Sequence, residues 1–93
     1  MPPPESAYQW LSLGYMSMGR GDFTRAQERF RNALELMPHL QPACVNLARS
    51  QAMVGDLEGV TVTVKRCRAI YPDADRDRGL EQVLADARAK RTS

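Results

Sequence analysis

Few residues in this chain have the type and spacing that catalysis or metal binding requires. The only histidine is His39, which follows Pro38, whereas a metal site needs several His, Cys or carboxylate ligands that converge on one point. The sequence also has no Ser-His-Asp arrangement, no GxGxxG motif and no P-loop. We therefore interpret His39 as a solvated loop residue and expect no enzymatic activity and no bound metal or cofactor.

Three aspartates, Asp73, Asp75 and Asp77, alternate along the chain as calcium ligands do. A calcium loop also needs a glycine at its sharp turn and a glutamate that closes it after about 12 residues. Neither residue stands at the required place. Because the N-terminal end of a helix favours negative charge, we interpret these aspartates as helix-capping residues instead.

Two cysteines, Cys44 and Cys67, are too few for a scaffold held together by disulfides. The N-terminal Met-Pro-Pro-Pro-Glu has neither the basic nor the apolar region of a signal peptide. Uninterrupted apolar runs are only a few residues long, so we expect no segment that inserts into a membrane. Together these features predict a cytoplasmic protein.

The 93 residues correspond to one small domain. Apolar residues make up 43% of the chain and charged residues 26%, which is typical of a globular protein. Thirteen basic and eleven acidic residues give a net charge of only +2, with both signs spread along the chain. This charge lacks the strongly basic footprint of a nucleic-acid-binding protein, so we expect no nucleic-acid partner.

An internal repeat organises the chain. When the chain is shifted by 34 residues, the pair Gly21-Asp22 falls on Gly55-Asp56, and Pro38 falls on Pro72. Small and apolar positions also coincide, so that Phe30 falls on Val64. Self-similarity at such a period is typical of helical repeat architectures.

Apolar residues at helical spacing, with glycines and prolines between them, predict five helices. The expected ranges are about 6–18, 22–37, 42–54, 56–71 and 75–90. The run from Val60 to Val64 alternates β-branched residues and by itself favours a strand. We still expect a helix there, because the repeat register and the flanking turn residues outweigh five positions. The residues of the last helix that we expect to face inward are Leu80, Val83, Leu84 and Ala87.

The first unit resembles a tetratricopeptide repeat (TPR). The residues that carry the resemblance are Trp10, Leu13-Gly14, Ala26, Phe30, Ala33 and Pro38. Ser17 departs from the pattern, which has Tyr at that place. The second unit is weaker, with Cys44 at the Trp position and Val64 at the aromatic position.

This resemblance implies an all-α fold, in which two helix-turn-helix repeats and one C-terminal helix form a right-handed superhelix. The first repeat would span about residues 7–40, the second about 41–74, and a capping helix about 75–90, all within one domain. The helical-hairpin arrangement also brings the start of the third helix near the end of the fourth. Cys44 and Cys67 could therefore form a disulfide, or they could be two small buried apolar residues.

TPR proteins bind partners in the concave groove that the first helix of each unit lines. The resemblance places there Tyr8, Leu11, Tyr15 and Met18 from the first unit, Val45, Asn46, Arg49 and Met53 from the second, and Arg76, Leu80 and Val83 from the last helix. Tyrosine and methionine surfaces suit an apolar peptide or an amphipathic helix. The family resemblance thus predicts a protein–protein interaction module, such as an adaptor, scaffold or dedicated chaperone, of the kind found in bacteria.

Two alternatives to partner binding remain open. The groove could be filled by a second copy of the chain in a self-assembling structural unit, or its apolar residues could simply be exposed. Some TPR domains clamp the C-terminal carboxylate of chaperones, and Asn46 matches that pattern. Leu11, Tyr15 and Leu80 occupy positions where the clamp has polar or basic residues. We therefore expect no chaperone-tail clamp.

Overall fold

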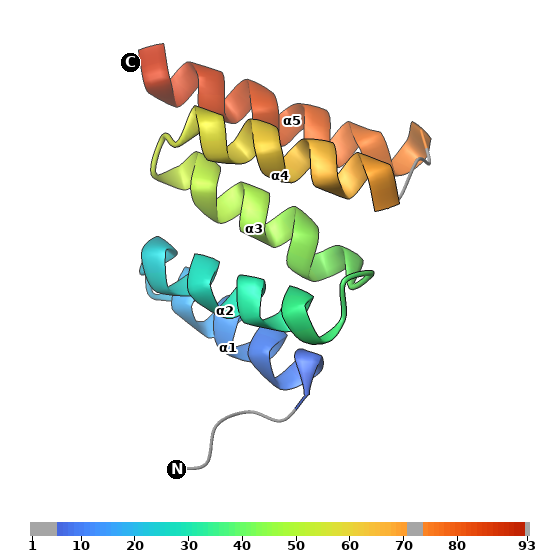
Figure 1. The fold of residues 1–93 in the computed structure, drawn as a ribbon. Helices are drawn as coiled ribbons and strands as arrows, with labels where there is room; N and C mark the ends of the chain where they lie inside the picture. Colours follow the sequence, from blue (N-terminus) through green and yellow to red (C-terminus); the bar gives the residue numbers. More distant parts are fainter. Residues whose placement is uncertain (1–5, 71–73, 93) are drawn as a thin grey trace.

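The structure is a computed structural model that describes residues 6–70 and 74–92. Within those ranges it contains helices only, and these are α1 (Ala7–Gly19), α2 (Phe23–Leu36), α3 (Gln41–Met53), α4 (Leu57–Ile70) and α5 (Ala74–Thr92). Figure 1 shows that the helices follow one another from one end of the molecule to the other, α1 with α2, then α3 with α4, then α5. The predicted all-α helical-repeat fold is confirmed.

The same Gly-Asp turn joins the two helices of each hairpin. Gly21 and Gly55 have φ angles of +77° and +76°, a conformation that glycine adopts without steric cost. The aspartate that follows each glycine caps the next helix, since Asp22 Oδ1 accepts from the Arg25 amide at 3.1 Å and Asp56 Oδ1 accepts from the Gly59 amide at 3.0 Å. The repeated sequence therefore produces a repeated turn. The roles expected of Pro72 and of the side chains of the three aspartates at 73, 75 and 77 lie outside the described residues.

The β-branched run within α4 is helical, as predicted. Val60 and Val64 are buried on one side of the helix. The Thr61 hydroxyl donates to a backbone carbonyl one turn earlier at 2.8 Å. The buried Thr63 hydroxyl donates to Gln51 Oε1 on α3 at 2.7 Å. Both hydroxyl groups therefore have hydrogen-bond partners while α4 stays helical. Burial of Val60 and Val64 outweighs the local preference for a strand.

The first hairpin is held together by a close approach of α1 and α2. Gly14 lies against the ring of Phe30, which is fully buried. A Cβ atom added at Gly14 would come within 2.7 Å of Phe30 Cδ1, closer than side-chain atoms can pack. Tyr15 packs edge-on against the same ring, with the ring centroids 5.8 Å apart. The absence of a side chain at Gly14 thus makes room for the largest buried residue.

The second hairpin is held by a covalent bond between its helices. Cys44 on α3 and Cys67 on α4 form a disulfide, with their Cα atoms 5.9 Å apart, and both side chains are buried. Both expectations for this pair therefore hold in part, because the cysteines fill apolar core positions and are also linked. Cys44 stands at the repeat position that Trp10 occupies in the first unit.

Helix α5 covers the far side of the second hairpin. Its inward stripe of Leu80, Val83, Leu84 and Ala87 is buried, as expected, and packs against α3 and α4. Arg68 on α4 forms an ion pair with Glu81 on α5 at the edge of this contact. In the described ranges, no helix combines the length and apolar character that crossing a membrane requires.

We predict that reducing the disulfide lowers the stability of the protein by about 3 kcal/mol, because a cross-link between residues 23 positions apart restricts the unfolded chain. Urea unfolding followed by circular dichroism, with and without a thiol reductant, measures this difference. The double variant Cys44→Ala/Cys67→Ala should not respond to the reductant. Identical unfolding midpoints for the wild type in both conditions would contradict the prediction.

We also predict that Gly14→Ala destabilises the protein by about 1–3 kcal/mol, because the new methyl group overlaps Phe30 in a filled core. Intrinsic helix propensity alone would favour alanine by about 1 kcal/mol, so the two effects oppose each other. Gly19→Ala is the matched control, since nothing lies within 4 Å of a Cβ there. Thermal unfolding of both variants tests the prediction, which fails if Gly14→Ala is as stable as Gly19→Ala.

Candidate functional site

Helices α1 and α3 are the first helices of the two hairpins and are called the inner helices below. They differ from the other helices in charge. Helix α1 has no charged residue, and α3 has a single one, Arg49. The charged residues of α2, by contrast, are Arg25, Glu28, Arg29, Arg31 and Glu35. Since the outward-facing positions of a helix are normally charged or polar, two inner helices that together carry a single charge mark a surface with another purpose.

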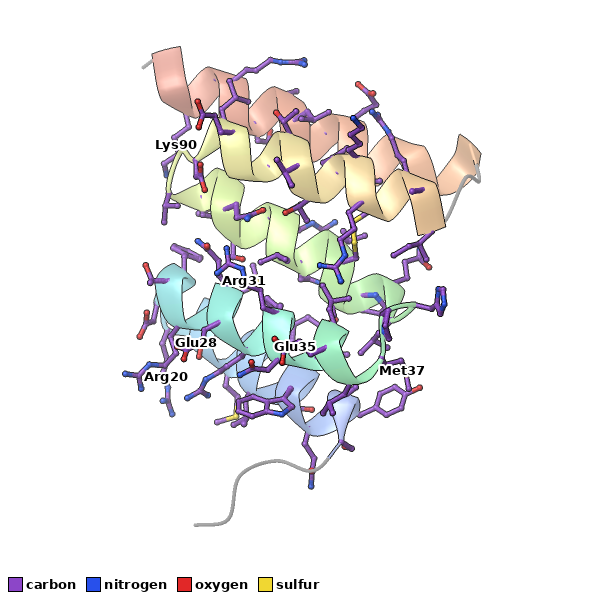
Figure 2. All side chains as sticks on the ribbon, viewed as in Figure 1. Arg20, Glu28, Arg31, Glu35, Met37 and Lys90 are labelled. Atoms are coloured by element: carbon purple, nitrogen blue, oxygen red, sulfur yellow. A yellow bond between two sulfur atoms is a disulfide. The ribbon has the colours of Figure 1, made fainter. Side chains whose placement is uncertain are left out.

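A pocket of about 610 Å³ opens between α1, α3 and α5. Its lining residues are Met18 from α1, Arg49, Ala52 and Met53 from α3, and Gly79, Gln82, Val83, Asp86 and Lys90 from α5. Figure 2 shows Lys90 near the C-terminal end of α5, beside the turn between α3 and α4. The pocket is therefore at one end of the layer formed by the first helix of each unit, where TPR proteins are expected to have their groove.

The apolar residues predicted to line the groove on α1 and α3 fall into two groups by exposure. Tyr8, Tyr15 and Met53 are the large apolar residues that remain exposed, at 60%, 45% and 44%. A second group, half-buried and packed against the core, consists of Leu11, Met18 and Val45. Tyr15 also packs against the buried ring of Phe30, so Tyr8 and Met53 are the better probes of binding.

Of the two expected groove residues on α5 whose side chains are described, one lines the pocket and the other does not. Leu80 is only 3% exposed and belongs to the core, so it does not line the pocket. Val83 is equally buried, yet its edge reaches the pocket wall. The physical reason is that both belong to the inward stripe of α5, which is in contact with α3 and α4. The side chain of Arg76 lies outside the described residues.

A polar contact joins the two inner helices. Asn46 Nδ2 on α3 donates to the Tyr15 hydroxyl on α1 at 3.4 Å and to the Pro42 carbonyl at 2.8 Å. Both hydrogens of the amide group are therefore engaged within the protein. Asn46 positions Tyr15 at the surface, and its amide oxygen faces no partner among the contacts of the described residues.

Most of the residues that sequence reasoning missed lie on one face of α5. Gly79, Gln82, Asp86 and Lys90 recur at intervals of three and four along α5, next to the buried stripe. That spacing is readable in the sequence, but it identifies a pocket only once the position of α5 against α3 is known. Ala52 on α3 also lines the pocket and was not predicted. It is next to Met53 and is itself largely buried.

The outer face offers a different surface. A second hollow of about 480 Å³ lies between α2, α3 and α4, and its rim carries charges of both signs, from Arg31, Asp56, Glu58 and Arg66. In Figure 2, Arg31 projects from α2 toward this side of the second hairpin. No group of three or more histidine, cysteine or acidic side chains in the described ranges is placed to hold a metal ion. The groove between α1, α3 and α5 is thus the more apolar surface of the two.

The comparisons with known proteins point to one family. A family model described as a tetratricopeptide repeat matches residues 17–83, which is more than half of the chain. The matched segment begins near the end of α1 and ends about halfway along α5. A comparison with curated proteins found no match.

Proposed function

The chain belongs to the tetratricopeptide repeat family, and we propose that it is an interaction module that binds an apolar or amphipathic segment of a partner protein in the groove between α1, α3 and α5. Repeats of this family generally mediate protein–protein interaction, and stacked helical repeats form concave binding surfaces. In keeping with that role, we propose no catalytic activity and no cofactor. Adaptor, scaffold and dedicated chaperone are the forms that the role could take.

The observation that carries the proposal is the exposure of large apolar side chains on the two inner helices that lack charges. Tyr8, Tyr15 and Met53 are each more than 40% exposed, and α1 and α3 together contain one charged residue. Exposed tyrosine provides a large contact area at a low entropic cost, and methionine adapts to the shape of a partner. Such a surface supports binding of a peptide or helix more than binding of a nucleic acid, which requires a basic face.

We further propose that the repeats are arranged as their sequence predicts. The first repeat would span about residues 7–40, the second about 41–74, and the capping helix about 75–90, in one domain. The burial of Leu80, Val83, Leu84 and Ala87 against the second hairpin supports the capping role of α5. The end formed by α1 and α2 has no such cover among the described residues.

The small number of cysteines predicts a cytoplasmic protein, whereas the disulfide between Cys44 and Cys67 favours an oxidising compartment. Disulfides persist in oxidising compartments and are rare in the cytosol, where thiols are kept reduced. We propose that the linked form between Cys44 and Cys67 works in an oxidising compartment. In a reducing cytoplasm the second hairpin would depend on packing alone.

We predict that Met53→Glu weakens peptide binding at least about tenfold, because it places a carboxylate in an apolar contact surface. The probes are peptides selected by the wild-type protein from a random 12-residue library displayed on phage, and fluorescence anisotropy measures their Kd. Val62→Glu is the matched control, since Val62 is 69% exposed on α4 and lines the outer hollow. Equal loss of affinity in both variants would contradict binding in the groove.

Sedimentation of the wild type at several concentrations separates this proposal from self-assembly. A monomer leaves the groove free for a partner. If a second copy fills the groove instead, the wild type sediments as an oligomer, Met53→Glu dissociates it, and Val62→Glu does not. That outcome would replace partner binding by the self-assembling unit as the function of this surface.

A further inference from the structure

Arg49 is a charged residue of the groove, in a pocket that Asp86 and Lys90 of α5 also line. It is the only charged residue on α1 and α3, and its side chain is exposed. Among the residues that the structure describes, no acidic side chain forms an ion pair with it. Other arginines are engaged, as Arg25 is with Asp22 and Arg68 with Glu81. The groove therefore presents one guanidinium group to an incoming ligand.

Arg49 shares its pocket with four apolar side chains and also with Gln82, Asp86 and Lys90. Met18, Ala52, Met53 and Val83 line the same pocket. The acidic residue in this pocket is Asp86 on α5, and Asp86 Oδ1 accepts a hydrogen bond from Gln82 Nε2 at 2.9 Å. A ligand that covers these apolar residues also removes water from Arg49. Loss of water around an unpaired guanidinium is costly unless the ligand supplies a negative partner.

The Tyr15 hydroxyl is a second polar group on the inner helices, and it does not line the pocket of Arg49. Its oxygen accepts from Asn46 Nδ2, so its own hydrogen remains available to a ligand. Arg49 follows Asn46 by one turn of α3. The guanidinium group of Arg49 offers hydrogen-bond donors to a ligand, and donors select acceptors such as carboxylate oxygens.

We propose that the segment bound in the groove combines apolar side chains with an aspartate or glutamate whose carboxylate pairs with Arg49. This inference rests on the proposed function, and it adds the charge of the partner. The apolar part of the segment covers Met18 and Met53, and its carboxylate forms hydrogen bonds with the guanidinium group. A segment with lysine or arginine at the same place would be repelled, because it would bring a further positive charge into a pocket that Arg49 and Lys90 already line.

The test uses the same phage library of random 12-residue peptides and three arginine or methionine variants. Peptides selected by the wild type are expected to contain an acidic residue flanked by apolar ones. Changing that acidic residue to its amide, or changing the protein to Arg49→Glu, should each raise the Kd about tenfold in 0.15 M salt. Combining Arg49→Glu with a peptide that carries lysine at the acidic position should restore binding.

Arg66→Glu is the matched control, because Arg66 is exposed on the outer hollow and its substitution changes the net charge by the same amount. Binding of the acidic peptide should be nearly unchanged in this variant. Circular dichroism and the unfolding midpoint of each variant establish that the fold is intact.

The outcomes distinguish the inference from the function on which it rests. If the selected peptides show no acidic preference and bind Arg49→Glu as tightly as Arg66→Glu, while Met53→Glu still abolishes binding, the carboxylate pairing is refuted and groove binding stands. If Met53→Glu also has no effect on any selected peptide, both the inference and the proposed function are refuted.

Discussion

The structure depends on how closely the two helices of each hairpin approach. In the first hairpin the missing side chain at Gly14 admits the ring of Phe30, and small residues at Ala26 and Ala33 extend the contact along α2. A helical hairpin of this kind cannot bury its whole apolar face alone, so the hairpins must stack. Stacking then places α1, α3 and α5 side by side in one layer, and the groove between them is a consequence of that packing.

The second hairpin reaches a similar arrangement by different chemistry. It has Ala48 and Val64 at the positions of Gly14 and Phe30, so its helices lack the large aromatic contact. The disulfide between Cys44 and Cys67 provides a covalent constraint in its place. The buried hydrogen bond between Thr63 and Gln51 adds a polar contact between the same helices. Cys44 directly precedes Val45 and Asn46 on α3. The cross-link that stabilises this hairpin therefore also fixes the helix that contributes Arg49 and Met53 to the groove.

Periodicity made most of the fold predictable. The 34-residue shift fixed the turns at Gly21 and Gly55, and it correctly outweighed the strand-like preference of the run from Val60 to Val64 in α4. The disulfide was not decidable from the sequence, because two cysteines at helical core positions can be either free or linked until their Cα separation is known.

The groove was harder to predict than the fold, and α5 shows why. Neighbouring stripes on a helix are separated by only one residue position, so a pattern of apolar residues does not separate the core from the groove edge. Leu80 belongs to the core, whereas Gly79 lines the pocket. On α1 and α3 the groove residues were predicted from the family resemblance, and the structure adds that only one charged residue, Arg49, stands on these two helices. Arg49 is therefore the one charged side chain that α1 and α3 present to a ligand. An exposed guanidinium without an ion pair contributes little to the stability of the free protein. Its energetic effect arises only when a ligand excludes water, and at that moment it favours an acidic segment over a neutral or basic one of the same shape.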